Sequence, residues 1–151
     1  MSQTVTSNAG QTGLLATFFI RDALCALDAA GVQEVIRLGP LTPVRHAPRE
    51  VLGIINLRGR IVTILDAGLK LGCDPLVPTP ESRIFIIEDR NEFIGLVVDR
   101  VGEVVEEEEG RLAPAPANVP PTQSRFFKGV YRVGAKVITL VDVSQLLAEN
   151  N

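Results

Sequence analysis

The chain has 151 residues, a formal net charge of −3, and 46% hydrophobic against 22% charged residues. This length lets one compact body bury most of its apolar surface, so neither disulfides nor metal ions are needed to stabilise it. The acidic balance removes the electrostatic attraction that supplies most nonspecific nucleic-acid affinity, and a chain without tryptophan offers few aromatic platforms for stacking on bases.

The thiol and imidazole groups are few: two cysteines, Cys25 and Cys73, and one histidine, His46. Cysteines so sparse and widely spaced are typical of a reducing cytosol rather than of a disulfide-bonded secreted domain. One histidine and no CxxC give too few ligands for a structural zinc site. We expect two buried or unreactive thiols, and a Cys–His pair created by folding is the catalytic alternative that the sequence leaves open.

No segment has the pattern of a membrane anchor or a signal peptide. The most apolar N-terminal run, 14–32, contains Arg21, Asp22 and Asp28, which a spanning helix would bury at high cost. Residues 1–13 are small and polar, without a basic start or an apolar centre, and predict a disordered tail. We therefore expect a cytoplasmic protein.

Short apolar runs separated by turn signals fill the first part of the chain. They predict strands at 15–20, 25–27 and 32–36, a proline-containing connection at 38–48 and one helical turn at 48–52. In the strand at 32–36 the alternation places Val32, Glu34 and Ile36 on one face and Gln33 and Val35 on the other. Glu34 therefore lies among apolar neighbours.

Two apolar runs on either side of Arg58-Gly59 predict a β-hairpin over 53–66, with the glycine supplying the positive φ of a tight turn. The same unit recurs at 129–142 without a gap: Gly53 aligns with Gly129, Thr63 with Thr139 and Asp66 with Asp142. A short helix is expected after each aspartate, since Asp is a favoured N-cap residue. The sequence is thus an internal duplication.

The second part of the chain repeats the order of the first. We expect a proline-rich linker at 73–82, strands at 84–87, 93–98 and 101–105, a surface loop at 110–123 and a last helix from Asp142 to Leu147. The two similar halves span about 15–72 and 83–147. So many short strands with no long helix predict an all-β architecture of two small barrels or sheets, packed on each other through apolar surface.

Acidic residues are the remaining candidates for chemistry. Asp66 and Asp142 could form a carboxylate pair, but their positions before short helices favour N-capping. The run Glu106–Glu109 could bind a cation, but adjacent carboxylates repel one another and a solvated acidic loop is favoured. No glycine pattern predicts a phosphate-binding loop.

Arg58 is the residue that most invites a functional interpretation. The duplicated hairpin has Gly134 at the same place, so the turn geometry is shared between the copies and the arginine is not. We consider both an ordinary exposed turn residue and a residue that binds a partner or braces the fold. Glu34 is its natural partner, because an arginine–carboxylate pair has favourable hydrogen-bond geometry.

The run GIINLRGRIVTILDAGLKLG, preceded by VQEVI and followed later by GVYRVGAKVITLVDVSQLL, resembles the CheW family of chemotaxis coupling proteins. The resemblance covers 14–151 and is specific because the NLRG run stands in a duplicated context. It implies two SH3-like five-stranded β-barrels packed around a shared hydrophobic core, with short helices. It also implies a non-enzymatic scaffold, without cofactor, metal or catalytic residues, that links methyl-accepting chemoreceptors to the regulatory domain of a CheA-type histidine kinase.

The resemblance also implies which residues face the receptor. Glu34 and Arg58 match the family's glutamate and arginine in that region. The neighbours expected beside a receptor helix are Val32, Val35, Leu57 and Asn56.

A small-ligand sensor with a pocket between two barrels is the alternative function. It predicts a thermal shift with a metabolite and no kinase partner. A nucleic-acid-binding barrel is disfavoured by the acidic balance and the few aromatic residues.

Overall fold

The computed structural model describes residues 13–107, 112–114 and 126–148. The predicted tail, Glu108 and Glu109, and most of the predicted loop at 110–123 lie outside these residues. The chain forms two compact units: unit 1 contains Met1–Gly31 and Gly102–Asn151, and unit 2 contains Val32–Val101.

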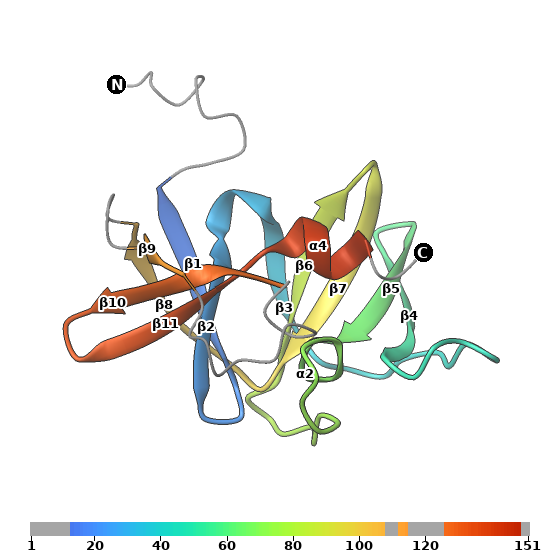
Figure 1. Ribbon diagram of the computed structural model, residues 1–151. Coiled ribbons are helices and arrows are strands. Elements are labelled where there is room, and N and C mark those ends of the chain that lie inside the picture. Colours follow the sequence, from blue (N-terminus) through green and yellow to red (C-terminus); the bar gives the residue numbers. More distant parts are fainter. Residues whose placement is uncertain (1–12, 108–111, 115–125, 149–151) are drawn as a thin grey trace. The chain divides into compact units, whose positions relative to one another are not determined.

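Unit 1 is built on a six-stranded sheet in the order β8-β1-β2-β11-β10-β9. Its elements are β1 (Leu14–Ile20), β2 (Ala23–Asp28), a 3-10 turn η1 (Ala29–Gly31), β8 (Arg100–Glu106), β9 (Leu112–Ala113), β10 (Phe127–Val133), β11 (Lys136–Val141) and helix α4 (Val143–Ala148). The pairs β1–β2 and β10–β11 are antiparallel hairpins, and β11 joins β2 in parallel. Figure 1 shows this pairing, with the blue β1–β2 hairpin beside the orange-red β10–β11 hairpin.

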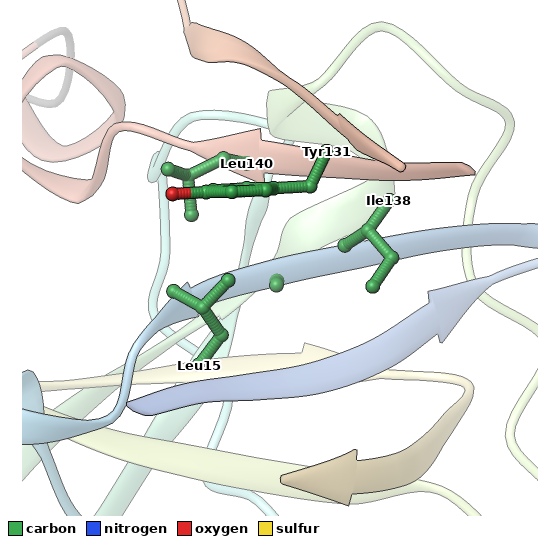
Figure 2. Packing of buried hydrophobic residues seen from close by; sticks show 5 residues of the cluster. Leu15, Tyr131, Ile138 and Leu140 are labelled. Atoms are coloured by element: carbon green, nitrogen blue, oxygen red, sulfur yellow. The ribbon is translucent and has the colours of Figure 1, made fainter. Parts of the chain in front are cut away.

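The core of unit 1 draws on both hairpins. Leu15, Tyr131, Ile138 and Leu140 are buried together with Ala26, and Figure 2 shows their side chains converging between the strands. The Tyr131 hydroxyl donates to Oε2 of Glu107 at 3.0 Å, so the polar end of a buried ring has an acceptor. This unit is therefore stabilised by the packing of aliphatic side chains around one tyrosine whose hydroxyl is hydrogen-bonded.

Unit 2 is built on a five-stranded sheet in the order β3-β6-β7-β5-β4. Its elements are β3 (Val32–Arg37), β4 (Val51–Leu57), β5 (Arg60–Asp66), helix α2 (Ala67–Lys70), β6 (Arg83–Asp89) and β7 (Glu92–Val98). Hairpins β4–β5 and β6–β7 are antiparallel, and β5 joins β7 in parallel. One core cluster contains five fully buried aliphatic residues: Val62, Ile64, Ile84, Ile86 and Val97.

The all-β fold class with short helices is confirmed, but the compact units are not the two sequence halves. Unit 2 combines β3, β4 and β5 from the first half with β6 and β7 from the second, and residues 73–82 lie inside it. Unit 1 combines the first hairpin with the strands from β8 onward. In each unit, a hairpin from one sequence half therefore pairs with a hairpin from the other half. The pairing is parallel: β2 with β11 in unit 1 and β5 with β7 in unit 2.

Two local expectations were wrong. The segment at 48–52 makes a turn closed by a 3.0 Å bond from Val51 N to Pro48 O, and β4 begins at Val51 instead of after a helical turn. Unit 1 has a sixth strand, because Leu112 and Ala113 in the predicted loop pair with Tyr131 and Val130 of β10. The prolines of this segment begin at Pro114, after these two residues, so their missing donors do not prevent Leu112 and Ala113 from joining an edge.

Both aspartates of the duplicated unit cap helices, as predicted. Asp66 Oδ1 accepts from Leu69 N, and Asp142 Oδ1 accepts from Gln145 N, each at 3.2 Å. Asp66 is 1% exposed and does more, because its Oδ2 also accepts from Leu76 N at 2.8 Å. This carboxylate therefore holds the segment after α2 against the end of β5 by a hydrogen bond.

Replacing Asp66 with alanine should lower the free energy of unfolding by about 2–4 kcal/mol. The backbone amides of Leu69 and Leu76 would both lose their acceptor, and the first of them lies next to buried residues. The matched change Asp142→Ala removes one capping bond and should cost about 1 kcal/mol. Denaturant titrations followed by circular dichroism measure both. Equal losses would show that the bond to Leu76 N does not contribute.

Candidate functional site

The turn between β4 and β5 presents Arg58 at the edge of unit 2. Leu57 pairs with Arg60, so Arg58 and Gly59 form a two-residue hairpin loop. Both have positive φ, 51° for Arg58 and 85° for Gly59, as a type I′ turn requires. The aligned Gly134 has φ 62°. An arginine therefore occupies a left-handed position where the duplicate has glycine, at a conformational cost that glycine avoids.

Asn56 shapes this turn. Its side-chain oxygen accepts from Gly59 N at 2.9 Å, which is the local bond that makes asparagine a favoured turn residue. Sequence reasoning placed Asn56 among the receptor-facing residues and missed this bond. The spacing of an asparagine three residues before a turn glycine is the signal that could have revealed it.

Glu34 reaches Arg58 from β3. The predicted alternation is present, with Val32, Glu34 and Ile36 half-buried and Gln33 and Val35 exposed. Ile36 packs against the core cluster of unit 2, so Glu34 lies on the same inner face of the strand. Oε1 of Glu34 accepts a hydrogen bond from Nη2 of Arg58, and the two groups form an ion pair.

The ion pair joins the two edges of the sheet. β3 and β4 are the outermost strands of unit 2, and Arg58 directly follows β4. The pair thus connects the first and last strands in the manner of a closed barrel. The Arg58 side chain keeps 69% of its surface exposed and the Glu34 side chain 32%, so most of the arginine side chain remains accessible to another molecule.

The predicted apolar neighbours do not all share this face. Leu57 is half-buried and packs against the unit 2 core. Val32 is also half-buried, but it pairs with Ile87 whereas Glu34 pairs with Ile86, so the register shift between them separates Val32 from the Glu34 face. Val35 is 43% exposed on the opposite side of the strand. The structure brings together Glu34 and Arg58, and it presents Val35 in another direction.

The two cysteines and the acidic residues are the remaining candidates for chemistry. Cys25 is buried and Cys73 is exposed. Within the described ranges, no cluster of three or more His, Cys, Asp or Glu side chains is arranged to hold a metal ion. None of the helices described here is long and apolar enough to cross a membrane.

Comparison with known proteins gives one consistent result. Residues 15–151 match the model of the CheW-like domain. The chain is 31% identical over 150 residues to the probable chemotaxis protein CheW of Rhizobium etli, covering 99% of this chain and 96% of that protein. It is 30% identical over 132 residues to the chemotaxis protein CheW of Rhizobium meliloti, covering 87% and 85%.

A solved structure agrees with these relatives. The scaffolding protein TtCheW from Thermoanaerobacter tengcongensis superimposes with a TM-score of 0.81 at 28% identity, over 93% of this chain and 90% of that one. The duplicated β units and the exposed arginine turn fit a protein that acts by binding. The chain belongs to the CheW family and is a non-enzymatic chemotaxis coupling adaptor.

Proposed function

We propose that this adaptor links the cytoplasmic tip of methyl-accepting chemoreceptors to the regulatory domain of a CheA-type histidine kinase, and that it acts in the cytoplasm. The observation that carries the receptor contact is the Arg58–Glu34 pair, in which a largely exposed guanidinium is held in a fixed place by a half-buried carboxylate. A charged group held in place in this way loses little further side-chain entropy when a partner binds.

The geometry favours one part of the predicted receptor surface over the rest. Glu34, Arg58 and Leu57 lie around the turn and the inner face of β3, and Val32 is half-buried at the start of that strand. A receptor helix placed there could bury the exposed parts of the two aliphatic side chains and hydrogen-bond the guanidinium. Asn56 contributes by fixing the turn, and Val35 lies on the opposite side of β3.

A separate set of exposed aliphatic residues supports contacts with the kinase. Val35 and Ile61 are 43% and 61% exposed in unit 2. Their counterparts in the duplicated sequence, Val104 and Val137, are 61% and 48% exposed. Each unit therefore offers an exposed apolar strand surface, which makes these surfaces candidates for docking of the kinase.

Co-sedimentation tests the proposal. Purified protein is mixed with membranes or assemblies carrying receptor cytoplasmic fragments, with purified kinase, and with both together. We expect the protein to sediment with receptor alone and to increase the amount of kinase that sediments with receptor. Absence of binding to both partners, with the protein folded by circular dichroism, would contradict the proposal.

A further inference from the structure

A second arginine lies beside the Arg58 turn, at the first position of β5. Arg60 is exposed and stands directly opposite Leu57 in the β4–β5 pair, so the two side chains lie on the same face of the hairpin. Val62 and Ile64, further along β5, belong to the unit 2 core. Because side chains alternate along a strand, Arg60 continues the core-facing side of β5 beyond the buried residues.

All five strands of unit 2 contribute a side chain to this end of the sheet. β5 and β7 are parallel, with Thr63 beside Ile94, so the β4–β5 and β6–β7 turns lie at the same end (Figure 1). The core-facing residues nearest to this end, one from each strand, are Glu34, Glu88, Phe93, Arg60 and Leu57. We call this set, together with Arg58, the rim of unit 2.

Phe93 holds the Arg60 side chain in place. The guanidinium carbon of Arg60 lies 4.1 Å from the centre of the Phe93 ring, and Phe93 is half-buried against the core of unit 2. The ring face attracts the cation, and the stacking occupies one flat side of the guanidinium. Among the described residues, Arg60 makes no hydrogen bond and no ion pair. The N–H donors at the edge of the group are therefore available to another molecule.

Charge is distributed unevenly around the rim. The β4–β5 side carries two exposed arginines, and Glu34 pairs with only one of them, Arg58. Glu88 is exposed and stands opposite Phe93 on β6, and within the described ranges it forms no ion pair with Arg60. An incoming carboxylate would thus be attracted to the β5 side of the rim and repelled from the β6 side.

We propose that Arg60 is a second receptor-binding arginine, which forms an ion pair with an acidic side chain of the receptor helix, and that Phe93 is its positioning residue. The inference rests on the proposed receptor function and adds the chemistry that the receptor must present. Leu57 lies opposite Arg60, so a helix whose apolar face covers this leucine can bring a carboxylate to the guanidinium. Because the ring already restricts the arginine, the ion pair costs less side-chain entropy.

Isothermal titration of the full chain with a receptor cytoplasmic fragment tests the role of Arg60. Arg60→Glu should weaken binding about tenfold, because a charged donor is replaced by a repelling carboxylate. Its melting temperature should stay near that of the parent protein, since the side chain is exposed. Arg37→Glu is the matched control and should leave the affinity unchanged, because Arg37 is an exposed arginine at the other end of β3.

A double-mutant cycle tests the role of Phe93. Phe93→Leu should weaken receptor binding about threefold in the parent protein, because Arg60 keeps its charge but loses the ring that orients it. In the Arg60→Glu background the same change should have no further effect on affinity. An equal loss in both backgrounds would show that Phe93 acts on binding independently of Arg60, and would overturn its positioning role.

Charge exchange identifies the receptor group. Each Asp and Glu of the fragment is changed to Lys in turn, and one of these changes should weaken binding to the parent protein and restore binding to Arg60→Glu. If no exchange restores binding, the proposed ion pair is wrong.

The remaining outcomes separate this inference from the function on which it rests. If the parent protein and Arg60→Glu bind the receptor fragment equally well, the role of Arg60 is rejected and the receptor function stands. If the parent protein does not bind the fragment, both are rejected. Equal losses in Arg60→Glu and Arg37→Glu would assign the effect to net charge and also overturn the inference.

Discussion

Replacing Arg58 with glutamate should weaken binding to a receptor cytoplasmic fragment by about 30-fold or more, which is the effect expected for a residue at the centre of an interface. The reversed charge removes the guanidinium donors and places a carboxylate beside Glu34. The free energy of unfolding should fall by about 1 kcal/mol or less, because the pair is largely exposed and solvent-screened. Isothermal titration measures the affinity, and denaturant unfolding measures the stability.

Two further variants separate docking from bracing. Arg58→Gly places the residue of the duplicated hairpin, Gly134, at the same left-handed turn position, so its stability should stay within about 1 kcal/mol of the parent protein. Arg90→Glu reverses the charge of another exposed arginine at a hairpin turn, where φ is 54°, and should leave receptor affinity unchanged.

The combination of results decides the role of Arg58. Loss of affinity in both Arg58 variants with stability retained would support a docking surface. If affinity and stability fell together in both, the pair would act mainly as a brace between β3 and the β4–β5 turn. An equal affinity loss in Arg90→Glu would show that net charge, and not this position, governs binding.

The hairpin at the centre of unit 2 could be predicted because its signals are local. Apolar alternation set the strands, and Arg58-Gly59 set a two-residue loop with Leu57 opposite Arg60. The same local logic correctly placed Glu34 on the inner face of β3 and identified it as the partner of Arg58. Helix capping by Asp66 and Asp142 also follows from short-range spacing.

The strand partners could not be predicted from the same patterns. A period of two tells which face of a strand is buried but not which strand lies beside it. The parallel pairs β5–β7 and β2–β11 connect segments that are distant in sequence. Each of them places a hairpin from the first sequence half in the same sheet as a hairpin from the second half. The bond from Leu76 N to Asp66 was missed for a related reason, because the linker at 73–82 has no periodicity to orient it.

The glycine near the start of each duplicated hairpin is required because another backbone segment passes close to it. Gly53 has φ 157° and Gly129 has φ 153°, and each lies at a register shift in its strand. An added Cβ at Gly53 would lie 2.6 Å from Thr42 O, and one at Gly129 would lie 2.3 Å from Ala113 O. Both glycines therefore let a crossing segment pair closely with the strand.

Gly53→Ala should consequently lower the free energy of unfolding by about 3–5 kcal/mol. The methyl group would push residue 42 away from β4 and break two backbone bonds, Thr42 N to Ile54 O at 3.0 Å and Ile54 N to Thr42 O at 2.8 Å. The backbone would also be strained at a φ that alanine rarely adopts. Urea titration followed by circular dichroism measures the loss.

Gly39→Ala is the matched control in the same unit, since an added Cβ there meets no atom within 4 Å. It should change stability by less than about 1 kcal/mol, and the change should be stabilising because alanine restricts the unfolded chain. If Gly53→Ala were as stable as Gly39→Ala, the close approach of residue 42 to β4 would not be required for folding. The repeated glycine would then need an explanation in binding, which titration of the folded Gly53→Ala variant with receptor fragment would reveal.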